Sequence, residues 1–316
     1  MTPEELLTLR YQLPPFGEGA KPSKEMHAFC RFFGLEYAAD NPGLQHLFGY
    51  VDSGRYRLAT HLWRQDAAVA NLLLVHGYYD HTGLFSKLIE WGLSQRCNVL
   101  IFDLPGHGLS SGEPAVIGDF AEYACAIKDV LARVWLPELP LWVMGQSTGC
   151  AALMEFTRHF DWPFQATVLL APLVRPADWR KVSIAQRLLS PFVQSVPRKF
   201  SVNTGDETFL AFQQRDPLQC RTTPLAWLLA LRDWLKRFEK QNLGVGPACI
   251  VQGDRDQTVD WQYNVPLVQT LFPGSVVVKV EGAGHQLANE LPATRARYLH
   301  EVTRYLAAHD IALAQV

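Results

Sequence analysis

Short apolar runs that alternate with helical patterns constrain the fold of this 316-residue chain more than any other feature. Successive apolar residues predict strands at 70–75, 98–102, 141–144, 166–170, 248–251 and 275–280. Periodic segments between them predict helices near 83–95, 117–134, 147–160, 265–271 and 291–308. A strand that is apolar on both faces is typical of a parallel sheet with helices on each side. The sequence therefore predicts an α/β fold around a mostly parallel central sheet.

Three segments fall outside this alternation. The first 45 residues hold a predicted helix at 23–35 whose apolar side chains share one face. This face is expected to pack on the core, although its aromatic residues would also suit a membrane or a partner. Two extended runs around an Asp-Ser-Gly turn at 52–54 predict an antiparallel hairpin. After the sixth strand, helix-like segments follow one another without a comparable strand. The predicted division is an N-terminal leader at 1–45, a core at 46–171 and 247–316, and a helical cap at 172–246.

The bulk composition excludes several classes of protein. The net charge is −2, 48% of the residues are hydrophobic and 19% are charged, which argues against disorder and against nucleic-acid binding. The six cysteines form no C-x-x-C pair, so neither a disulfide framework nor a zinc site is expected. No phosphate-binding glycine motif follows a strand, and no cofactor is predicted. Because no run of 18 apolar residues occurs and the first residues resemble no signal peptide, the sequence predicts a cytoplasmic protein.

A serine stands where the predicted strand at 141–144 meets the following helix. Residues 145–149 read Gly-Gln-Ser-Thr-Gly, and Gly-x-Ser-x-Gly is the pattern of a nucleophile elbow. A sharp strand-to-helix turn presents the serine hydroxyl outward and requires small neighbours, which Gly145 and Gly149 provide. The pattern also occurs by chance in surface turns, but here both flanking elements match the setting that the chemistry needs. Ser147 is therefore the predicted nucleophile.

A nucleophilic serine needs a histidine as its base and a carboxylate that orients the histidine. Functional side chains of an open α/β sheet gather beyond the carboxyl ends of the strands, so the loops after the last two strands should supply both groups. The first of these loops contains Asp254, Asp256 and Asp260, and the second contains His285. The residues alone favour His285 as the base and leave three candidates for the acid.

Further motifs make the chain resemble a known superfamily. Beside the elbow they are Val-His-Gly-Tyr at 75–78, Asp-Leu-Pro-Gly-His-Gly-Leu-Ser at 103–110, Gly253 with Asp256 three residues later, and Gly284-His285 followed by Glu290. With these motifs in this order, residues 45–310 resemble the α/β-hydrolases, specifically the branch of monoacylglycerol lipases, lysophospholipases and related S33-type serine esterases. The resemblance implies a sheet with helices on both faces and a helical cap inserted after the sixth strand.

The resemblance also assigns roles to individual residues. It implies a metal-independent triad of Ser147, Asp256 and His285. It implies that the backbone amides of Tyr78 and Thr148 form the oxyanion hole. The residues on either side of the serine depart from the family, whose members often have His and Met at these positions. This change leaves the amide donor in place but can alter substrate preference.

Other residues near the motifs are expected to support the loops or to contact the substrate. His76, His107 and Asp103 are expected to brace the glycine-rich loops by hydrogen bonds. The residues expected to contact the substrate are His76, Gly77, Gln146, Trp179 and Trp227. Trp227 and Trp234 share a helical face that would line an acyl tunnel or close the small core of the cap.

The predicted cap is basic, with twelve Lys and Arg against six Asp and Glu between 172 and 245. The amphipathic stretch at 179–189 would suit contact with anionic lipid or an anionic substrate, or would simply be the solvated face of a packed helix. Peripheral membrane contact through the cap is therefore one expectation, beside a purely structural role.

Together these features predict a serine hydrolase that cleaves carboxylic esters through an acyl-enzyme. The expected substrates are lipid esters such as monoacylglycerols or lysophospholipids, and nucleic acid is not an expected partner. A peptidase or amidase, or an acyltransferase, would use the same triad. A homologue that binds a ligand without catalysis is the alternative outside enzymes.

Overall fold

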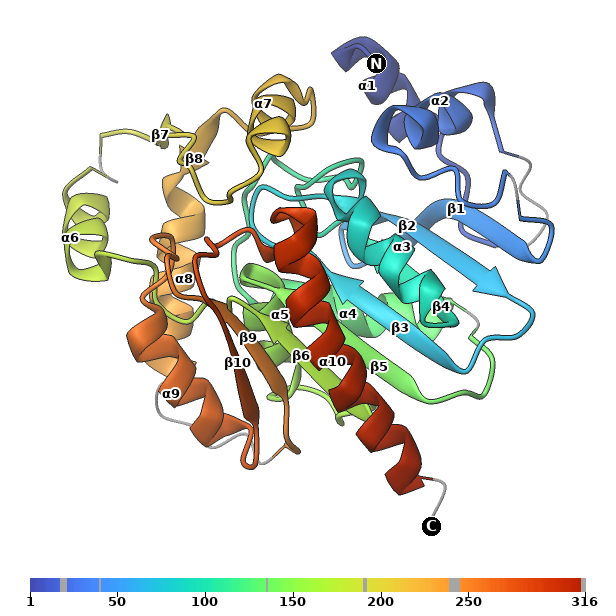
Figure 1. Ribbon diagram of the computed structural model, residues 1–316. Helices are drawn as coiled ribbons and strands as arrows, with labels where there is room; N and C mark the ends of the chain where they lie inside the picture. Colours follow the sequence, from blue (N-terminus) through green and yellow to red (C-terminus); the bar gives the residue numbers. More distant parts are fainter. Residues whose placement is uncertain (18–21, 40, 135, 190–191, 239–244, 314–316) are drawn as a thin grey trace.

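The computed structural model describes the protein except residues 18–21, 40, 135, 190–191, 239–244 and 314–316 (Figure 1). At its centre lies an eight-stranded sheet in the order β1-β2-β4-β3-β5-β6-β9-β10. The strands are β1 (Leu44–Ser53), β2 (Tyr56–Gln65), β3 (Ala70–Val75), β4 (Cys97–Phe102), β5 (Leu141–Gln146), β6 (Ala166–Leu170), β9 (Cys249–Gly253) and β10 (Val276–Val280). Strand β2 pairs antiparallel with β1 and β4, and the other neighbours pair in parallel. The predicted mostly parallel sheet is confirmed.

Helices cover both faces of the sheet, as the apolar runs predict. Along β3, Leu72 and Leu74 pack into one core cluster, whereas Leu73 and Val75 pack into the other. This alternation follows from the two-residue period of a strand. The first cluster is covered by α3 (Ser86–Ser94) and α10 (Pro292–Leu313), and the second by α4 (Ala121–Arg133), α5 (Thr148–Phe156) and α9 (Trp261–Leu271). Short 3₁₀ helices, η1 (Thr82–Phe85) and η2 (Leu287–Asn289), lie beside the site described below.

Two helices precede the sheet. In α2 (Lys24–Phe33), the apolar side chains of Met26, Phe29 and Phe33 are buried in the same cluster as α3 and α10. The helix α1 (Pro3–Gln12) is not among the helices predicted from sequence. The sequence marks this helix through its N-terminal cap: the hydroxyl of Thr2 accepts a hydrogen bond from the amide of Glu5, and the carboxylate of Glu5 accepts one from the amide of Thr2.

The segment between β6 and β9 gathers at one end of the sheet (Figure 1). It contains α6 (Trp179–Leu189), α7 (Glu207–Arg215) and α8 (Leu225–Phe238). It also contains a short antiparallel pair, β7 (Ser195–Pro197) and β8 (Thr222–Pro224), so this insertion is not wholly helical. Strands of three largely solvent-facing residues carry no apolar alternation, which is why the sequence pattern does not reveal them.

Candidate active site

Ser147 occupies a strained turn between β5 and α5. Its backbone has φ 51° and ψ −111°, in a region that residues other than glycine rarely adopt. A Cβ atom on Gly149 would lie 2.1 Å from the carbonyl oxygen of Val75, and one on Gly145 would lie 3.0 Å from the amide nitrogen of Cys150. Glycine is therefore required on both sides because neighbouring backbone approaches closely. This is the geometry of a nucleophile elbow.

Three side chains form a continuous hydrogen-bonded row at the elbow. Nε2 of His285 lies 2.9 Å from Oγ of Ser147, and Nδ1 lies 2.7 Å from Oδ2 of Asp256. The other carboxylate oxygen of Asp256 accepts the amides of Thr258 and Val259 at 2.8 and 3.2 Å. All three members of the row are buried. The loop after β9 thus holds the carboxylate, and the carboxylate holds the imidazole against the serine.

The charges of Asp256 and His285 stabilise each other. Burial by itself raises the pKa of Asp256, but the nearby His285 and the hydrogen bonds outweigh it and hold the pKa below its usual value. For His285, burial lowers the pKa, yet the carboxylates of Asp256 and Asp80 outweigh it and raise the pKa above 6.5. The site is therefore arranged to stabilise an imidazolium, the form that His285 takes once it has accepted a proton.

The other two candidate acids lie elsewhere. Oδ1 of Asp254 accepts the amide of Gly282 at 2.8 Å. Asp260 precedes the first turn of α9. Neither carboxylate is hydrogen-bonded to His285, so the geometry favours Asp256 as the acid.

Tyr78 and Thr148 line the same cavity as Ser147. Thr148 begins α5, and the first amides of a helix have no partner within the helix. The ring of Tyr78 stacks on Trp227 with centroids 3.8 Å apart, and its hydroxyl donates to the carbonyl of Ala115 at 2.7 Å. These contacts fix the side chain of Tyr78, whose backbone amide is one half of the oxyanion hole that the family resemblance implies.

The cavity measures about 250 Å³ and lies between the core and the insertion. Its apolar lining comes from Leu173, Pro176, Val182, Trp227, Leu228 and Val259. Its polar lining includes Asp80, Arg198, Lys199, Ser147, His285 and Gln286. An apolar wall with a few convergent polar groups is typical of a small-molecule site.

Of the five residues expected to contact substrate, only Trp227 lines this cavity. His76, Gly77 and Gln146 belong to the loops around Ser147 but are not part of the lining, and Trp179 packs partly buried against the core. The structure of α8 shows whether its aromatic face lines the cavity or packs in a core. Its first turn carries Trp227 into the cavity, and two turns later Trp234 is fully buried and donates to Glu155 at 2.9 Å. One face therefore serves both the cavity and the core.

The sequence pattern does not predict a polar network that lies next to the triad. The Gln146 side chain donates to Gln286 and accepts the amide of Ala288, and Gln286 donates to Asp80 at 2.7 Å. Burial raises the pKa of Asp80, while this hydrogen bond acts in the opposite direction. The signal for Asp80 was its place in the loop after β3, at the carboxyl edge of the sheet. The sequence does not point to Arg198 in this way, because that residue lies in the insertion and not in a loop at the carboxyl edge of the sheet.

The glycine-rich loops are braced as the sequence predicts for His76 and Asp103. Nε2 of His76 accepts the amide of Leu104 at 2.8 Å. The carboxylate of Asp103 accepts the amides of Thr82 and Leu109, both at 2.7 Å. These bonds join the loops after β3 and β4, which approach the site from neighbouring strands.

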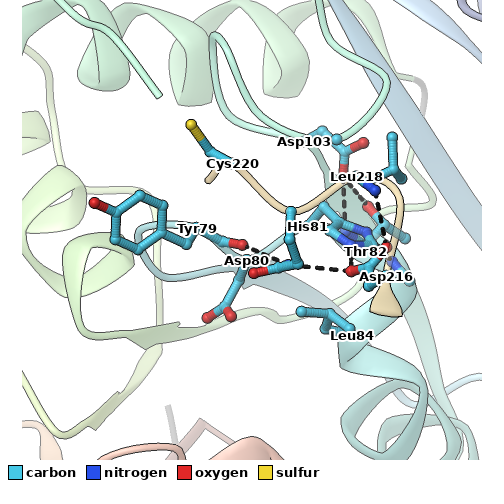
Figure 2. A network of polar contacts seen from close by, with 12 residues as sticks. Tyr79, Asp80, His81, Thr82, Leu84, Asp103, Asp216, Leu218 and Cys220 are labelled. Carbon is cyan, nitrogen blue, oxygen red and sulfur yellow. Dashed lines mark hydrogen bonds and ion pairs between the residues drawn. The ribbon is translucent and has the colours of Figure 1, made fainter. Parts of the chain in front are cut away.

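A buried ion pair joins the insertion to the core next to the cavity. Nε2 of His81 lies 2.8 Å from Oδ2 of Asp216, and both side chains are fully shielded from solvent. Figure 2 shows His81, Thr82 and Asp103 of the core beside Asp216 and Leu218 of the insertion. Burial opposes the charge on His81, but Asp216 outweighs it and raises the pKa of the imidazole.

Within the described part of the chain, no three His, Cys, Asp or Glu side chains gather as ligands of a metal ion would. Among the described helices, none combines the length and the apolar character of a membrane-spanning segment.

Comparison with known proteins places this geometry in a family. Residues 66–292 match the family model described as serine aminopeptidase, S33. The human monoglyceride lipase is 28% identical over 80% of this chain and 88% of its own length, and the phospholipase YtpA of Bacillus subtilis (strain 168) is 24% identical over 63% and 80%. A soluble variant of monoglyceride lipase from Saccharomyces cerevisiae superposes with a TM-score of 0.71 at 17% identity, over 83% of this chain and 94% of that one. The chain belongs to the serine aminopeptidase S33 family of α/β-hydrolases.

Proposed function

We propose that Ser147, His285 and Asp256 perform the ester hydrolysis of this serine hydrolase, and that its substrates are lipid esters of the monoacylglycerol or lysophospholipid type. The observation that carries this proposal is the hydrogen-bonded row from Asp256 through His285 to Ser147. The row ends at a serine that lines the cavity. A protein that only binds a ligand, without catalysis, would not need this arrangement.

The chemistry follows from the positions of these atoms. His285 takes the proton of the Ser147 hydroxyl as the oxygen attacks the ester carbonyl. The amides of Tyr78 and Thr148 stabilise the negative charge that develops on the carbonyl oxygen. His285 then returns its proton to the departing alcohol, which leaves an acyl-enzyme. Water, activated by His285 in the same way, releases the acid and restores the serine.

The apolar side of the cavity supports an acyl chain as the recognised group. Trp227, Leu228 and Val259 offer hydrocarbon surface within the same cavity as Ser147. Each CH₂ group that an acyl chain buries contributes about 0.8 kcal/mol. The names of the relatives, monoglyceride lipase and phospholipase, agree with an ester of this kind.

A substrate panel tests the proposal. The purified protein is given monooleoylglycerol, lysophosphatidylcholine, a long-chain amide and an aminoacyl anilide, with Ser147→Ala as the control for background. We expect fatty acid release from the first two, at a rate at least tenfold above the amide and the anilide. Faster cleavage of the anilide would favour a peptidase. Acyl transfer to added glycerol in preference to water would favour an acyltransferase.

We also propose that α6 rests on a lipid surface. Ile184 and Leu188 lie one helical turn apart and are 62% and 66% exposed. The exposed cations Arg180, Lys181 and Arg187 flank them on the same helix. An exposed apolar pair with adjacent positive charge suits the surface of an anionic membrane.

Co-sedimentation with vesicles tests this second proposal. The double variant Ile184→Ser/Leu188→Ser should bind several-fold more weakly to vesicles that contain phosphatidylserine. The matched control is Val276→Ser/Val277→Ser on β10, which removes a comparably exposed apolar pair (49% and 40%) from another part of the molecule. Equal binding by wild type and both variants would refute a role for α6.

A further inference from the structure

Arg198 is a cation on the wall of the catalytic cavity whose charge the proposed triad does not use. It lies in the insertion, directly after β7, and lines the cavity together with Ser147 and His285. The side chain is partly buried, and this burial lowers the pKa of its guanidinium, which Tyr79 and Asp80 partly offset. A desolvated cation is unfavourable unless a partner compensates the lost hydration.

The guanidinium is held in place on one side. Nη1 donates to Oε1 of Gln219 at 2.7 Å and to the carbonyl of Cys220 at 3.3 Å. The Cζ atom of the guanidinium lies over the ring of Tyr79, 3.8 Å from the ring centroid, and 4.4 Å from the ring centroid of Phe200. A guanidinium stacked on aromatic rings loses little further freedom when it binds a ligand.

This arrangement is tied to the buried ion pair of Figure 2. Gln219 donates to Asp216 at 3.1 Å and to the carbonyl of Tyr79 at 2.9 Å, and Asp216 pairs with His81 of the core. The contacts run from the core histidine through Asp216 and Gln219 to Arg198. The cation is therefore fixed relative to the sheet that carries Ser147, although it comes from the insertion.

The remaining nitrogens of Arg198 are available. Among the described residues, Nε and Nη2 have no hydrogen-bond partner and no carboxylate forms an ion pair with this side chain. Lys199, also on the cavity wall, is exposed and adds a second positive charge. Asp80 is the carboxylate that shares this wall beside the triad, and its oxygen Oδ1 already accepts a hydrogen bond from Gln286.

We propose that Arg198 binds an anionic group, a phosphate or a carboxylate, of the ester that Ser147 attacks. Nε and Nη2 form a planar pair of donors that matches two oxygens of either group. Lys199 strengthens the attraction from the rim of the cavity. This inference rests on the proposed function and narrows its substrates to esters that carry negative charge.

Matched pairs of substrates test the inference and show on which side of the ester the charge lies. The first pair is oleoyl lysophosphatidic acid and monooleoylglycerol, which differ by a phosphate on the alcohol side. The second is monomethyl suberate and methyl octanoate, which differ by a carboxylate on the acyl side. Lipids are presented in neutral detergent micelles so that surface charge is constant. The measured quantity is kcat/KM for the charged ester divided by kcat/KM for its neutral partner.

In Arg198→Gln, this ratio should fall about ten- to a hundredfold for at least one pair, because a hydrogen bond to a charged group is lost. The neutral esters should change less than about threefold, which also shows that the variant folds. Arg198→Lys should retain part of the preference because it keeps the charge without the planar donors. A loss on the phosphate pair assigns the anion to the alcohol, and a loss on the carboxylate pair assigns it to the acyl chain.

Arg221→Gln is the matched control. Arg221 is paired by its backbone with Arg198 across the β7–β8 ladder, but its side chain is exposed and does not line the catalytic cavity. Its removal changes the net charge equally and should leave both ratios within twofold. Unchanged ratios in Arg198→Gln, or equal losses in Arg198→Gln and Arg221→Gln, would overturn the inference. If the wild type hydrolyses neither neutral ester nor charged ester, the proposed function itself fails.

Discussion

Replacing Asp256 by asparagine should remove most of the activity without changing the shape of the site. The two amides of Thr258 and Val259 hold Oδ1 in place, so the oxygen of asparagine will stay there. Its NH₂ group then takes the position of Oδ2, 2.7 Å from Nδ1 of His285. Because that nitrogen must now accept, the imidazole proton moves to Nε2 and faces Ser147. A base in this tautomer cannot take the serine proton.

The expected loss in kcat is about ten-thousandfold, the size associated with a wrongly held tautomer. It corresponds to about 5.5 kcal/mol in the barrier. The side chain of Gln252 donates to Oδ2 at 3.1 Å, and its buried Oε1 has no hydrogen-bond partner among the described residues, so this amide can turn over to accept from the new NH₂ group. Folding should therefore survive the substitution.

The assay is hydrolysis of p-nitrophenyl butyrate, together with the rate of labelling by a fluorophosphonate. Asp254→Asn and Asp260→Asn are the matched controls, because both aspartates lie in the same loop and neither contacts His285. They should retain activity within about threefold. Activity of Asp256→Asn within tenfold of wild type, or a larger loss in either control, would refute the assignment of the acid.

Four further outcomes are expected. The kcat/KM profile should fall with a slope of one as His285 becomes protonated, at a midpoint above 6.5, since only the neutral imidazole is a base. Asp80→Asn removes a charge that stabilises the imidazolium, so this midpoint should move to lower pH; a fixed midpoint would mean another group titrates. Gly149→Ala forces a Cβ to within 2.1 Å of backbone oxygen and should cost about 1–3 kcal/mol or more in urea unfolding, and unchanged stability would contradict the close approach. Asp216→Ala leaves His81 buried without its partner and should lower the free energy of unfolding by about 3–5 kcal/mol, which a loss below 1 kcal/mol would disprove.

The parts of the fold that the sequence predicts well depend on local patterns. Strands that are apolar at successive positions, such as β3 and β4, are buried along their whole length, and the pattern reveals them directly. The elbow at Ser147 can be recognised from the sequence because the tight turn requires glycine on both sides of the serine, and both glycines lie within five residues of chain. The helix α1 has its signal in Thr2 and Glu5 rather than in an apolar face, so periodicity alone does not find it.

The cavity wall was much harder to predict because it brings together distant segments. Asp216 meets His81 across 135 positions of sequence, and Gln286 meets Asp80 across 206. No local period relates such residues, and Arg198 directly follows β7, a strand of only three residues with no apolar alternation. The sequence therefore predicts the reacting atoms well, whereas it predicts the residues that select the substrate poorly.

The central claim is that Ser147 is the nucleophile of an esterase, and the most direct measurement compares wild type with Ser147→Ala. Both are treated with a fluorophosphonate probe and with p-nitrophenyl esters from acetate to palmitate. We predict that wild type is labelled and turns over the esters, with an optimum that reflects the cavity of about 250 Å³, and that the variant loses labelling and turnover together. A variant that is still labelled, or that still cleaves the esters at the wild-type rate, would contradict the account.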